Sequence, residues 1–580
     1  DGDGRPDLFL AGLDAPSQLY RNLGGWRFTN VTATAVASPS PGGPFRAAED
    51  ATGAAFADVD GDGDLDLLVN SLGGGTRLFQ NDGPGRLSEV TDAAGLRTRG
   101  AAMSMALADV DGDGDLDLYV GNFRTTTILD APTTRFSMQV VDGEQRVSAV
   151  NGRPVTEPDL ANRFILGPPG EVQELGEADV LWLNDGRGRF RAASWTEGAF
   201  VDAAGKALPD APRDWALAVR FHDWTGDGRP DLYVCNDLWT PDRAWVNESA
   251  GGQVRFRALD TRSLRNNPTF SMGVDFGDVN RDGHVDFFAV DMLSRFHTNR
   301  MTQLAAMAPE FRPPGLIDDR VQMKRNVLQI HRGDGTFAET AWMAGVEASE
   351  WSWGPVFLDV DLDGHEDLLV SNGQHRDFQD NDGAARIAAA QKGGRPLTPG
   401  QIQDLVRTFP RLLTANVLFR NRGDATFEEI GAAWGFADPG ISQGMALADL
   451  DGDGDLDVVM NNLFDAPGLY RNEASAPRIA VRLKGAAPNT AGIGTEIRAL
   501  HAHPDGPAPQ SRQFIAGGRY LSGDEPLRVF AAPGGAALRL EVRWPGGRRS
   551  VVPDARPGRL YEVDFTGSAG PAAPDPGPPA

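Results

Sequence analysis

The chain has 580 residues, with 81 Asp and Glu against 55 Lys and Arg, so its formal net charge is −26 at pH 7. It has no basic stripe, which argues against nucleic-acid binding, and no run of about 18 apolar residues, which excludes a membrane-spanning helix. A single cysteine, Cys235, excludes an internal disulfide framework.

The first element of the chain is part of an acidic loop that recurs along the sequence. In the full pattern, D-x-D-x-D-G-x-x-D, positions 1, 3, 5 and 9 carry side-chain oxygens and position 7 can offer a backbone carbonyl. Glycine at position 6 permits a tight turn. The copies are the fragment Asp1–Asp7 and the loops Asp58–Asp66, Asp109–Asp117, Asp223–Asp231, Asp278–Asp286, Asp359–Asp367 and Asp449–Asp457.

This loop predicts a binding site for a hard cation. Calcium fits best because it accepts about 6–8 oxygen ligands in irregular geometry, whereas magnesium requires a near-ideal octahedron. The alternative, an EF-hand, needs a Glu at position 12 and flanking helices, but position 12 here is Val, Ala or Met. Short β-prone apolar runs follow each loop, so the loops are predicted to join two strands.

We predict about six to seven calcium ions, with weaker binding where Thr225 or Asn280 replaces the Asp at position 3, because ligand charge falls. Position 7 is counted through its backbone carbonyl. The candidate ligands are Asp1, Asp3 and Asp7; Asp58, Asp60, Asp62, Asp64 and Asp66; Asp109, Asp111, Asp113, Asp115 and Asp117; Asp223, Thr225, Asp227, Arg229 and Asp231; Asp278, Asn280, Asp282, His284 and Asp286; Asp359, Asp361, Asp363, His365 and Asp367; and Asp449, Asp451, Asp453, Asp455 and Asp457.

Each loop lies between a small-residue strand and an apolar strand, and a hairpin with a central Asn or Gly follows, as in Leu19–Phe28. Four-stranded units that recur at about 50 residues are typical of β-propeller blades. The pattern predicts seven blades within residues 1–475, an all-β fold. Because the strand that should precede Asp1 is absent, we expect an N-terminal truncation and a lost signal sequence.

Three of the repeat intervals are longer than the others and are predicted to be blades that carry insertions, at about 122–178, 292–325 and 372–415. One insertion contains a helix-start signature, with Thr398 as N-cap, Pro399 at the first helical position and Gln401 two residues later. Pro410 is expected to end this helical region. The insertions are therefore predicted to be partly helical.

The acidic pattern ends after Asn472, and alternating strands follow. Residues 476–566 are predicted to form a separate small all-β domain, and the Pro/Gly/Ala-rich residues 567–580 a disordered tail.

The repeats resemble FG-GAP/VCBS repeats, the calcium-loop blades of integrin α-subunit propellers. Through Gly492-Ile493-Gly494, Arg512–Pro526 and Glu541–Arg548, the C-terminal segment resembles the ASPIC/UnbV domain. The combination is similar to the cartilage acidic protein family, as a bacterial-type member. The resemblance implies a secreted or surface calcium-binding propeller with no catalytic residues to transfer.

The first functional hypothesis is a non-enzymatic, calcium-binding adhesion or ligand-recognition scaffold, located extracellularly, at the cell surface or in the periplasm. Its partner would be an unknown protein or glycan, and the oligomeric state stays open. The alternative is a secreted propeller enzyme that acts on a polysaccharide or glycoconjugate at a site built by the insertions, with His297, His375, Asp377 and Asp380 as available acid/base groups.

Two short motifs have structural explanations that we prefer. Gly440–Gly444 matches G-x-S-x-G around Ser442, but a strand and a cation loop follow it instead of the helix that a nucleophile elbow requires. Arg332-Gly333-Asp334 and Arg422-Gly423-Asp424 match the integrin-binding tripeptide, but both lie at predicted hairpin turns, where Gly and Asp are favoured by geometry.

Overall fold

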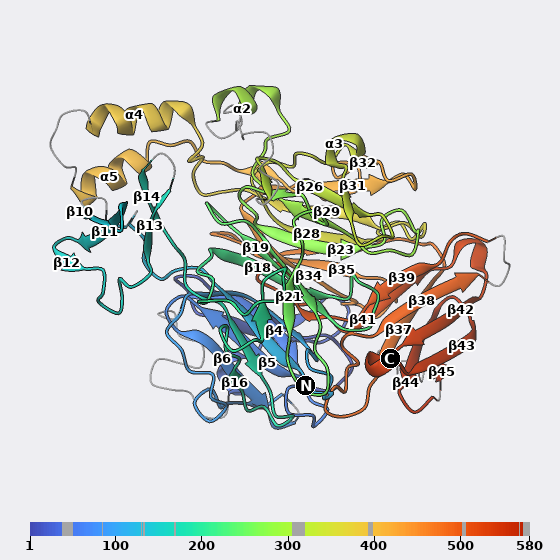
Figure 1. Cartoon of the computed structure of the whole chain (residues 1–580). Coiled ribbons are helices and arrows are strands. Elements are labelled where there is room, and N and C mark those ends of the chain that lie inside the picture. The colour runs from blue at the N-terminus through green and yellow to red at the C-terminus, as the bar shows by residue number, and fades with distance from the viewer. Residues whose placement is uncertain are drawn as a thin grey trace.

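The computed structural model describes residues 1–580 except 37–49, 84, 129, 132–133, 168–169, 304–319, 392–397, 502–505, 568 and 572–580. Strands predominate, as a series of small sheets in the first part of the chain and a further pair of sheets near the C-terminus, red in Figure 1. The predicted all-β class is confirmed.

Up to residue 475, the sheets follow the order of the acidic loops, and we number them along the chain. The strands before and after each complete loop are antiparallel neighbours. The strands are β1 (Leu8–Leu10), β2 (Gln18–Asn22) and β3 (Phe28–Asn30) in sheet 1; β4 (Ala51–Ala57), β5 (Asp66–Ser71), β6 (Gly75–Asn81) and β7 (Leu87–Glu89) in sheet 2; β8 (Ala102–Ala108), β9 (Asp117–Asn122), β15 (Val180–Leu183) and β16 (Arg191–Ala192) in sheet 3; β18 (Ala216–His222), β19 (Asp231–Asn236), β20 (Arg243–Asn247), β21 (Phe256–Ala258) and β17 (Phe200–Val201) in sheet 4; β23 (Gly273–Gly277), β24 (Asp286–Val290), β26 (Val327–His331) and β27 (Phe337–Glu339) in sheet 5; β28 (Ser352–Leu358), β29 (Asp367–Asn372), β31 (Val417–Asn421) and β32 (Phe427–Glu429) in sheet 6; and β34 (Ser442–Ala448), β35 (Asp457–Asn462) and β36 (Gly468–Tyr470) in sheet 7.

In most sheets, the strand that follows the loop is covered on both faces by neighbouring sheets. Every residue of β5, β9, β19 and β29 is buried, which explains why these strands are apolar without alternation. One apolar cluster joins Leu68 of sheet 2 to Leu118 of sheet 3, and another joins Leu369 of sheet 6 to Val458 of sheet 7. The strands that precede the loops contact each other in succession, from β4 through β8, β18, β23 and β28 to β34.

The first and last of these sheets also contact each other. Leu8 and Leu10 of β1 pack against Val459 of β35, while Leu19 of β2 packs with Leu67 of sheet 2. Sheet 1 therefore lies between sheets 7 and 2.

A side-chain amide links several neighbouring sheets. The Asn at or just after the end of the first hairpin strand donates a hydrogen bond from Nδ2 to the backbone carbonyl at position 2 of the acidic loop in the neighbouring sheet. The pairs are Asn22–Leu450 (3.0 Å), Asn184–Val59 (2.8 Å), Asn247–Val110 (3.0 Å), Asn421–Val279 (3.0 Å) and Asn472–Val360 (3.0 Å).

The insertions contain strands and helices, as expected. Thr398 and Gln401 form the predicted capping box at the start of α5. The first insertion, α4, α5 and α2 project from the same side of the molecule, away from the C-terminal sheets (Figure 1). The first insertion contains β10 (Phe136–Val141), β11 (Glu144–Val150), β12 (Arg153–Pro154), β13 (Phe164–Gly167) and β14 (Glu171–Glu174). The second contains α2 (His297–Thr302) and β25 (Val321–Met323), which pairs with β22 (Asn266–Pro268), and the third contains α4 (Asn381–Gln391), α5 (Pro399–Val406) and β30 (Thr414–Ala415), which pairs with β33 (Pro439–Gly440). Outside the insertions lie two short helices, α1 (Thr32–Ala35) and α3 (Ala341–Ala344).

The C-terminal part consists of two four-stranded sheets that enclose their own apolar core, which includes Ile497, Phe530 and Trp544. Within the segment predicted to be a disordered tail, Ala569–Pro571 form a strand on β44. The sheets have the orders β41 (Leu527–Ala531), β37 (Arg478–Lys484), β44 (Arg559–Asp564), β45 (Ala569–Pro571) and β39 (Gln510–Gln513), β38 (Glu496–His501), β42 (Leu538–Arg543), β43 (Arg549–Ala555), with short 3-10 turns η2 (Pro533–Gly535) and η3 (Pro545–Gly547).

One segment of this C-terminal part, residues 514–525, runs along the inner edges of sheets 2 to 7, and we call it the central segment. Its strand β40 (Ala516–Gly517) pairs with β8. The Tyr520 ring stacks on Trp353 of β28, with 5.6 Å between centroids. Further contacts join Leu521 to Ala54 and Ser104, Gly518 and Arg519 to Arg220 and Asp275, and Ser522 and Glu525 to Met445 and Leu447.

Candidate functional site

In every complete acidic loop, the backbone amide of position 6 donates to the position-1 carboxylate, and the loop Asp109–Asp117 illustrates the arrangement. Asp109 at position 1 accepts from the amides of Gly112 (2.8 Å) and Gly114 (3.1 Å), and Gly114 at position 6 has the positive φ of +98° that the turn requires. Asp117 at position 9 accepts from the amides of Val110 (3.0 Å) and Asn184 (2.9 Å). These contacts hold the carboxylates around one centre.

In four loops, three carboxylates converge closely enough to hold one ion. One oxygen from each residue lies within 4.8 Å of the others. Three carboxylate oxygens in these loops, Oδ1 of Asp115, Oδ1 of Asp361 and Oδ1 of Asp455, are buried without a hydrogen-bond partner among the described residues. Such a donor set fits a hard cation. The converging sets are Asp58, Asp60 and Asp62; Asp109, Asp111 and Asp117; Asp359, Asp361 and Asp367; and Asp449, Asp451 and Asp453.

These are the four loops that carry Asp at positions 1, 3, 5 and 9, and no comparable carboxylate triplet is found in the described residues of the other loops. In the loop Asp223–Asp231, the Thr225 hydroxyl lies 3.4 Å from Asp223, and the Arg229 side chain pairs with Asp227. In the loop Asp278–Asp286, the Asn280 amide donates to Asp282 (3.0 Å). The weaker binding predicted for these two loops stays a prediction.

In the partial first loop, Asp7 at position 9 accepts a hydrogen bond from the backbone amide of Asn22 (2.9 Å), as the position-9 Asp117 does from Asn184. Asp1 pairs with the guanidinium of Arg21, which also lies 3.3 Å from Asp3.

The electrostatics of the loops favour a bound cation. Burial raises the pKa of Asp66 to about 7 and the pKa values of Asp286 and Asp367 to about 8, and neighbouring loop carboxylates add to each shift. Burial also raises the pKa of Asp359 to about 7. Because the charged forms are disfavoured when these groups lie together, an ion between them would remove much of that penalty.

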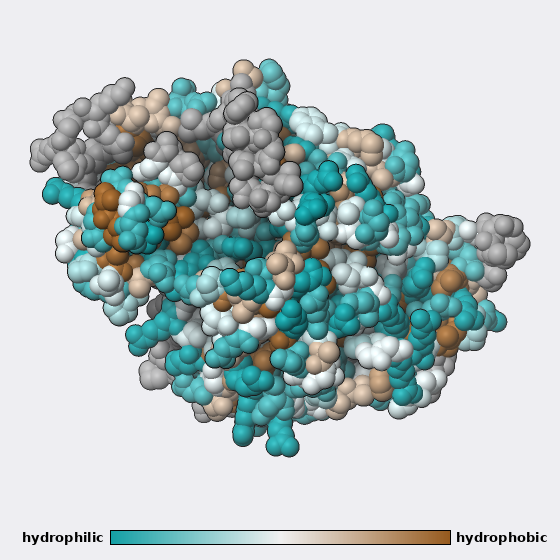
Figure 2. All heavy atoms as spheres, in the orientation of Figure 1, coloured by the Kyte–Doolittle hydropathy of each residue, from teal (hydrophilic) through white to brown (hydrophobic). Residues whose placement is uncertain are grey.

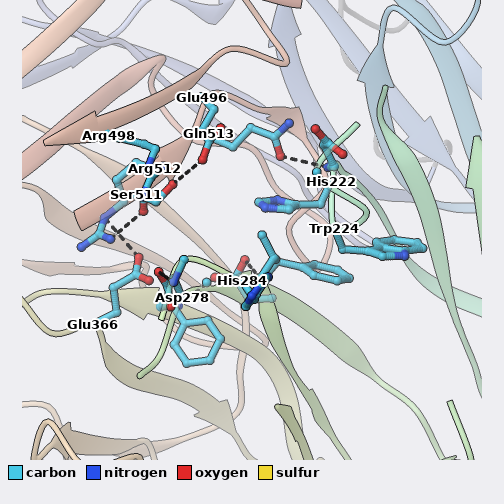
Figure 3. A pocket seen from close by; sticks show the side chains of 18 of the residues that line it. His222, Trp224, Asp278, His284, Glu366, Glu496, Arg498, Ser511, Arg512 and Gln513 are labelled. Atoms are coloured by element: carbon cyan, nitrogen blue, oxygen red, sulfur yellow. Dashed lines mark hydrogen bonds and ion pairs between the residues drawn. The ribbon is translucent and has the colours of Figure 1, made fainter. Parts of the chain in front are cut away.

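A cavity of about 490 Å³ lies between sheets 4 to 6 and the C-terminal sheets. Figure 3 shows side chains from both parts of the chain around it: His222, Trp224, Asp278, His284 and Glu366 from the sheet region, and Glu496, Arg498, Ser511, Arg512 and Gln513 from the C-terminal sheets. We call it the interdomain cavity. Glu366 pairs with Arg512 (3.2 Å), and Gln513 accepts from the Asp223 amide (3.3 Å) across it.

Comparison with known families accounts for both parts of the chain. The FG-GAP-like repeat matches residues 1–69, 58–120, 223–289 and 380–460, and the ASPIC and UnbV domain matches residues 485–569. The chain is an FG-GAP repeat protein with an ASPIC and UnbV domain. It is homologous to cartilage acidic protein 1, as the resemblance implied.

Cartilage acidic protein 1 of Homo sapiens is 25% identical over 401 residues, which cover 64% of this chain and 55% of that protein. The Xenopus tropicalis protein of the same name is 27% identical over 261 residues, 39% of each chain. This FG-GAP repeat protein therefore spans about half the length, or less, of these relatives.

Two solved structures resemble the chain weakly. A lectin of Agrocybe aegerita that recognises non-reducing terminal N-acetylglucosamine has a TM-score of 0.37 and 14% identity, with 81% of this chain and 92% of that chain covered. The NanB sialidase of Streptococcus pneumoniae has a TM-score of 0.33 and 8% identity, with 73% and 67% covered. TM-scores this low support no conclusion about ligand or activity.

The residue that precedes the hairpin Asn in the FG-GAP repeats also contributes to the loops, and the sequence interpretation missed it. Arg420 pairs with Asp361 (2.7 Å) and Asp363 (2.9 Å), and Arg471 pairs with Asp451 (2.8 Å). Gln80 holds the equivalent position and donates to Asp60. The recurrence of Arg or Gln before Asn, in Arg21-Asn22, Gln80-Asn81, Arg420-Asn421 and Arg471-Asn472, was the available signal.

The acid/base candidates of the insertions do not line the interdomain cavity. The insertions that carry them do meet, since Gln303 and Asp380 form an isolated β-bridge. Burial raises the pKa of Asp377, which lies in the same region. The enzyme alternative, with His297, His375, Asp377 and Asp380, stays a prediction.

The two short motifs have structural roles here. Ser442 begins β34 and is buried, where its hydroxyl donates to Asn462 (2.8 Å) and accepts from Asn416 (3.1 Å). In the two Arg-Gly-Asp turns, Asp334 and Asp424 accept from the amides two residues later, at 2.9 and 3.0 Å.

Among the described residues, no helix is both long and apolar enough to cross a bilayer.

Proposed function

We propose that this protein is a calcium-binding seven-bladed β-propeller, located outside the cytoplasm, that acts as a non-enzymatic recognition scaffold. The observation that carries the calcium assignment is the convergence of three carboxylates in each of four loops. Hard carboxylate oxygens in an irregular arrangement suit calcium better than magnesium. Asp111, for example, would contribute through Oδ, and the residue at position 7 through its backbone carbonyl.

A closed ring of blades is supported by the contacts of sheet 1. Sheet 1 packs against sheet 7 through Leu8, Leu10 and Val459, and against sheet 2 through Leu19 and Leu67. With sheets 2 to 7 already in succession, these contacts support the proposed ring of seven blades within residues 1–475. Residues 476–566 form the second domain in this proposal.

The recognition surface is proposed to be the side on which the insertions gather. Among these, Met138, Val140 and Ile165 expose apolar side chains, and Figure 2 shows apolar atoms gathered over β10 to β12. Projecting loops on a rigid scaffold are common places for ligand contacts. An extracellular or periplasmic location is supported by the number of acidic loops whose negative charge calcium would neutralise. Calcium is abundant in those compartments.

The test is a calcium titration of the chelator-treated protein, followed by glycan-array and pull-down binding with and without calcium. Heat of binding at several sites, together with a calcium-dependent rise in melting temperature, is the expected result. Magnesium at the same concentration is the control. An absence of calcium binding would overturn the proposal, and turnover of a polysaccharide by the purified protein would favour the enzyme alternative.

A further inference from the structure

The interdomain cavity contains more unpaired hydrogen-bond donors than unpaired acceptors. Among the described residues that line it, three buried N–H groups have no partner: Nε of Arg220, Nε1 of Trp224 and Nη2 of Arg512. One carboxylate oxygen, Oε2 of Glu366, is also unpaired, and His222 Nδ1 can donate or accept according to its tautomer. A buried donor without a partner is costly, so a ligand that supplies acceptor oxygens here would be stabilised.

The charges of the lining residues favour a negative ligand. Asp275 pairs with both Arg220 (2.9 Å) and Arg519, and Arg519 also pairs with Asp524 (2.8 Å), so this buried group is balanced in charge. Arg498 lines the cavity and is exposed, and its guanidinium has no hydrogen bond or ion pair within the described part of the chain. Glu366 already pairs with Arg512.

Of the remaining carboxylates in the lining, Glu496 accepts from the Ser511 hydroxyl (2.8 Å) and lies 3.7 Å from Arg543, and three others belong to acidic loops. Asp223, Asp278 and Asp359 hold position 1, and each accepts two backbone amides of its own loop. In the proposed function these three carboxylates bind calcium, which neutralises their charge. The inference rests on the proposed function in this respect. The arginines would then outnumber the free carboxylates of the cavity.

The unpaired oxygen of Glu366 adds a second requirement. An ionised carboxylate can only accept hydrogen bonds, so its natural partner on a ligand is a hydroxyl group. The volume of about 490 Å³ is within the usual range for small-ligand sites. A ligand that combines a carboxylate with hydroxyl groups would satisfy both sides of the cavity.

We propose that the interdomain cavity binds a small hydroxy-carboxylate of the sugar-acid class. Its carboxylate accepts hydrogen bonds from Arg498 and Arg512, and a hydroxyl donates to Glu366. Trp224, in the wall formed by sheet 4, provides a further N–H donor. Because these groups come from both parts of the chain, neither part forms the site alone.

The test uses isothermal titration calorimetry of the full chain in calcium buffer with three probes. Galacturonate carries both functional groups, galactose only hydroxyls, and succinate only carboxylates. We expect galacturonate to bind at least about tenfold more tightly than either of the others, as loss of one charge-assisted hydrogen bond predicts. Equal affinity for galactose or for succinate, or no binding of galacturonate, would overturn the inference.

The matched variants are Arg498→Gln and Arg539→Gln. Both arginines lie on the same sheet, but Arg539 is paired with Glu541 (3.0 Å) and does not line the cavity. Arg498→Gln should weaken galacturonate binding about tenfold or more, while Arg539→Gln leaves it unchanged. Equal effects of the two substitutions would contradict the assignment.

A calcium-dependent melting curve, measured on the same samples, separates the two proposals. If calcium stabilises the protein but galacturonate does not bind, the cavity assignment fails and the calcium propeller stands. If calcium has no effect on melting and galacturonate still binds through Arg498, the calcium assignment fails and the cavity assignment stands.

Discussion

The side-chain amide of Asn22 donates a 3.0 Å hydrogen bond to the backbone carbonyl of Leu450, 428 residues further along the chain. Both residues are buried, and the contact joins sheet 1 to the acidic loop of sheet 7. The same contact recurs between other neighbouring sheets. The separation of 428 residues is therefore explained by the contact of sheet 1, at the start of the chain, with sheet 7.

Asn22→Ala should lower the free energy of unfolding by about 1–3 kcal/mol, because the Leu450 carbonyl would lose a buried donor. Chemical denaturation monitored by tryptophan fluorescence measures this change. Asn30→Ala is the control, since the Asn30 side chain is exposed and its two hydrogen bonds, to Gln18 (3.2 Å) and from the Thr32 backbone amide (3.0 Å), are both at the surface. Equal stability of the two variants would argue against a structural role for the Asn22 contact.

Removal of calcium should lower the melting temperature. A site that binds only the folded state contributes about 2.7 kcal/mol when calcium is present at 100 times its dissociation constant, and several sites add together. Differential scanning calorimetry in calcium and in excess EGTA measures the effect. Superimposable curves in the two buffers would contradict calcium stabilisation.

Asp111→Asn should remove one strong site and leave the others. The Asp111 carboxylate is one of the three that converge in its loop, and loss of one charged ligand weakens binding. Terbium luminescence titration counts the strong sites before and after the change. Asp142→Asn, in an exposed hairpin turn away from the loops, should not alter the count.

Without calcium, the protein should lose stability as the pH rises. Burial raises the pKa of Asp66 to about 7 and those of Asp286 and Asp367 to about 8, above the ordinary value of 3.8. The folded state therefore binds more protons than the unfolded state, so this contribution is fully present below about pH 4 and is lost as the pH rises through 7 to 8. Melting temperatures in EGTA at pH 5 and pH 8 test the sign.

With calcium present, this trend should disappear or reverse, because calcium binds the deprotonated carboxylates. A melting temperature in EGTA that is higher at pH 8 than at pH 5 would show that other groups dominate.

Arg519→Met should destabilise the protein by about 3–5 kcal/mol, because it leaves buried carboxylates without their cation. Arg519 pairs with Asp275 of sheet 5 and with Asp524 (2.8 Å), and all three side chains are buried. Arg539→Met, on an exposed surface, is the control. Thermal melting and limited proteolysis between the two parts of the chain measure the effect, and a stability loss no larger than that of the control would contradict this role.

The local features of the fold were predictable from the sequence. The acidic loops, the hairpins and the capping box at Thr398 depend on residues a few positions apart, so their patterns are visible in a single chain. The Asn that follows each hairpin strand was visible too, but its acceptor lies in the preceding repeat, and spacing alone does not identify that partner.

The contacts of the second domain were not predictable by the same means. Arg519 meets Asp275, 244 residues earlier, and Tyr520 meets Trp353. Nothing in either local sequence indicates the other, because the contact depends on how two distant parts of the chain pack together. The interdomain cavity has the same origin, which is why residues such as Arg512 and Glu366 were not candidates from sequence alone.

The central segment has a consequence for any shortened form of the protein. Since residues 514–525 touch the inner strands of six sheets, a fragment that ends near residue 475 would expose Trp353 and leave Asp275 without one of its two arginines. Such a fragment is expected to aggregate or to sample loosened inner strands. We therefore expect the repeats and the C-terminal part to fold as a single unit, so that expression of either part by itself would misrepresent both.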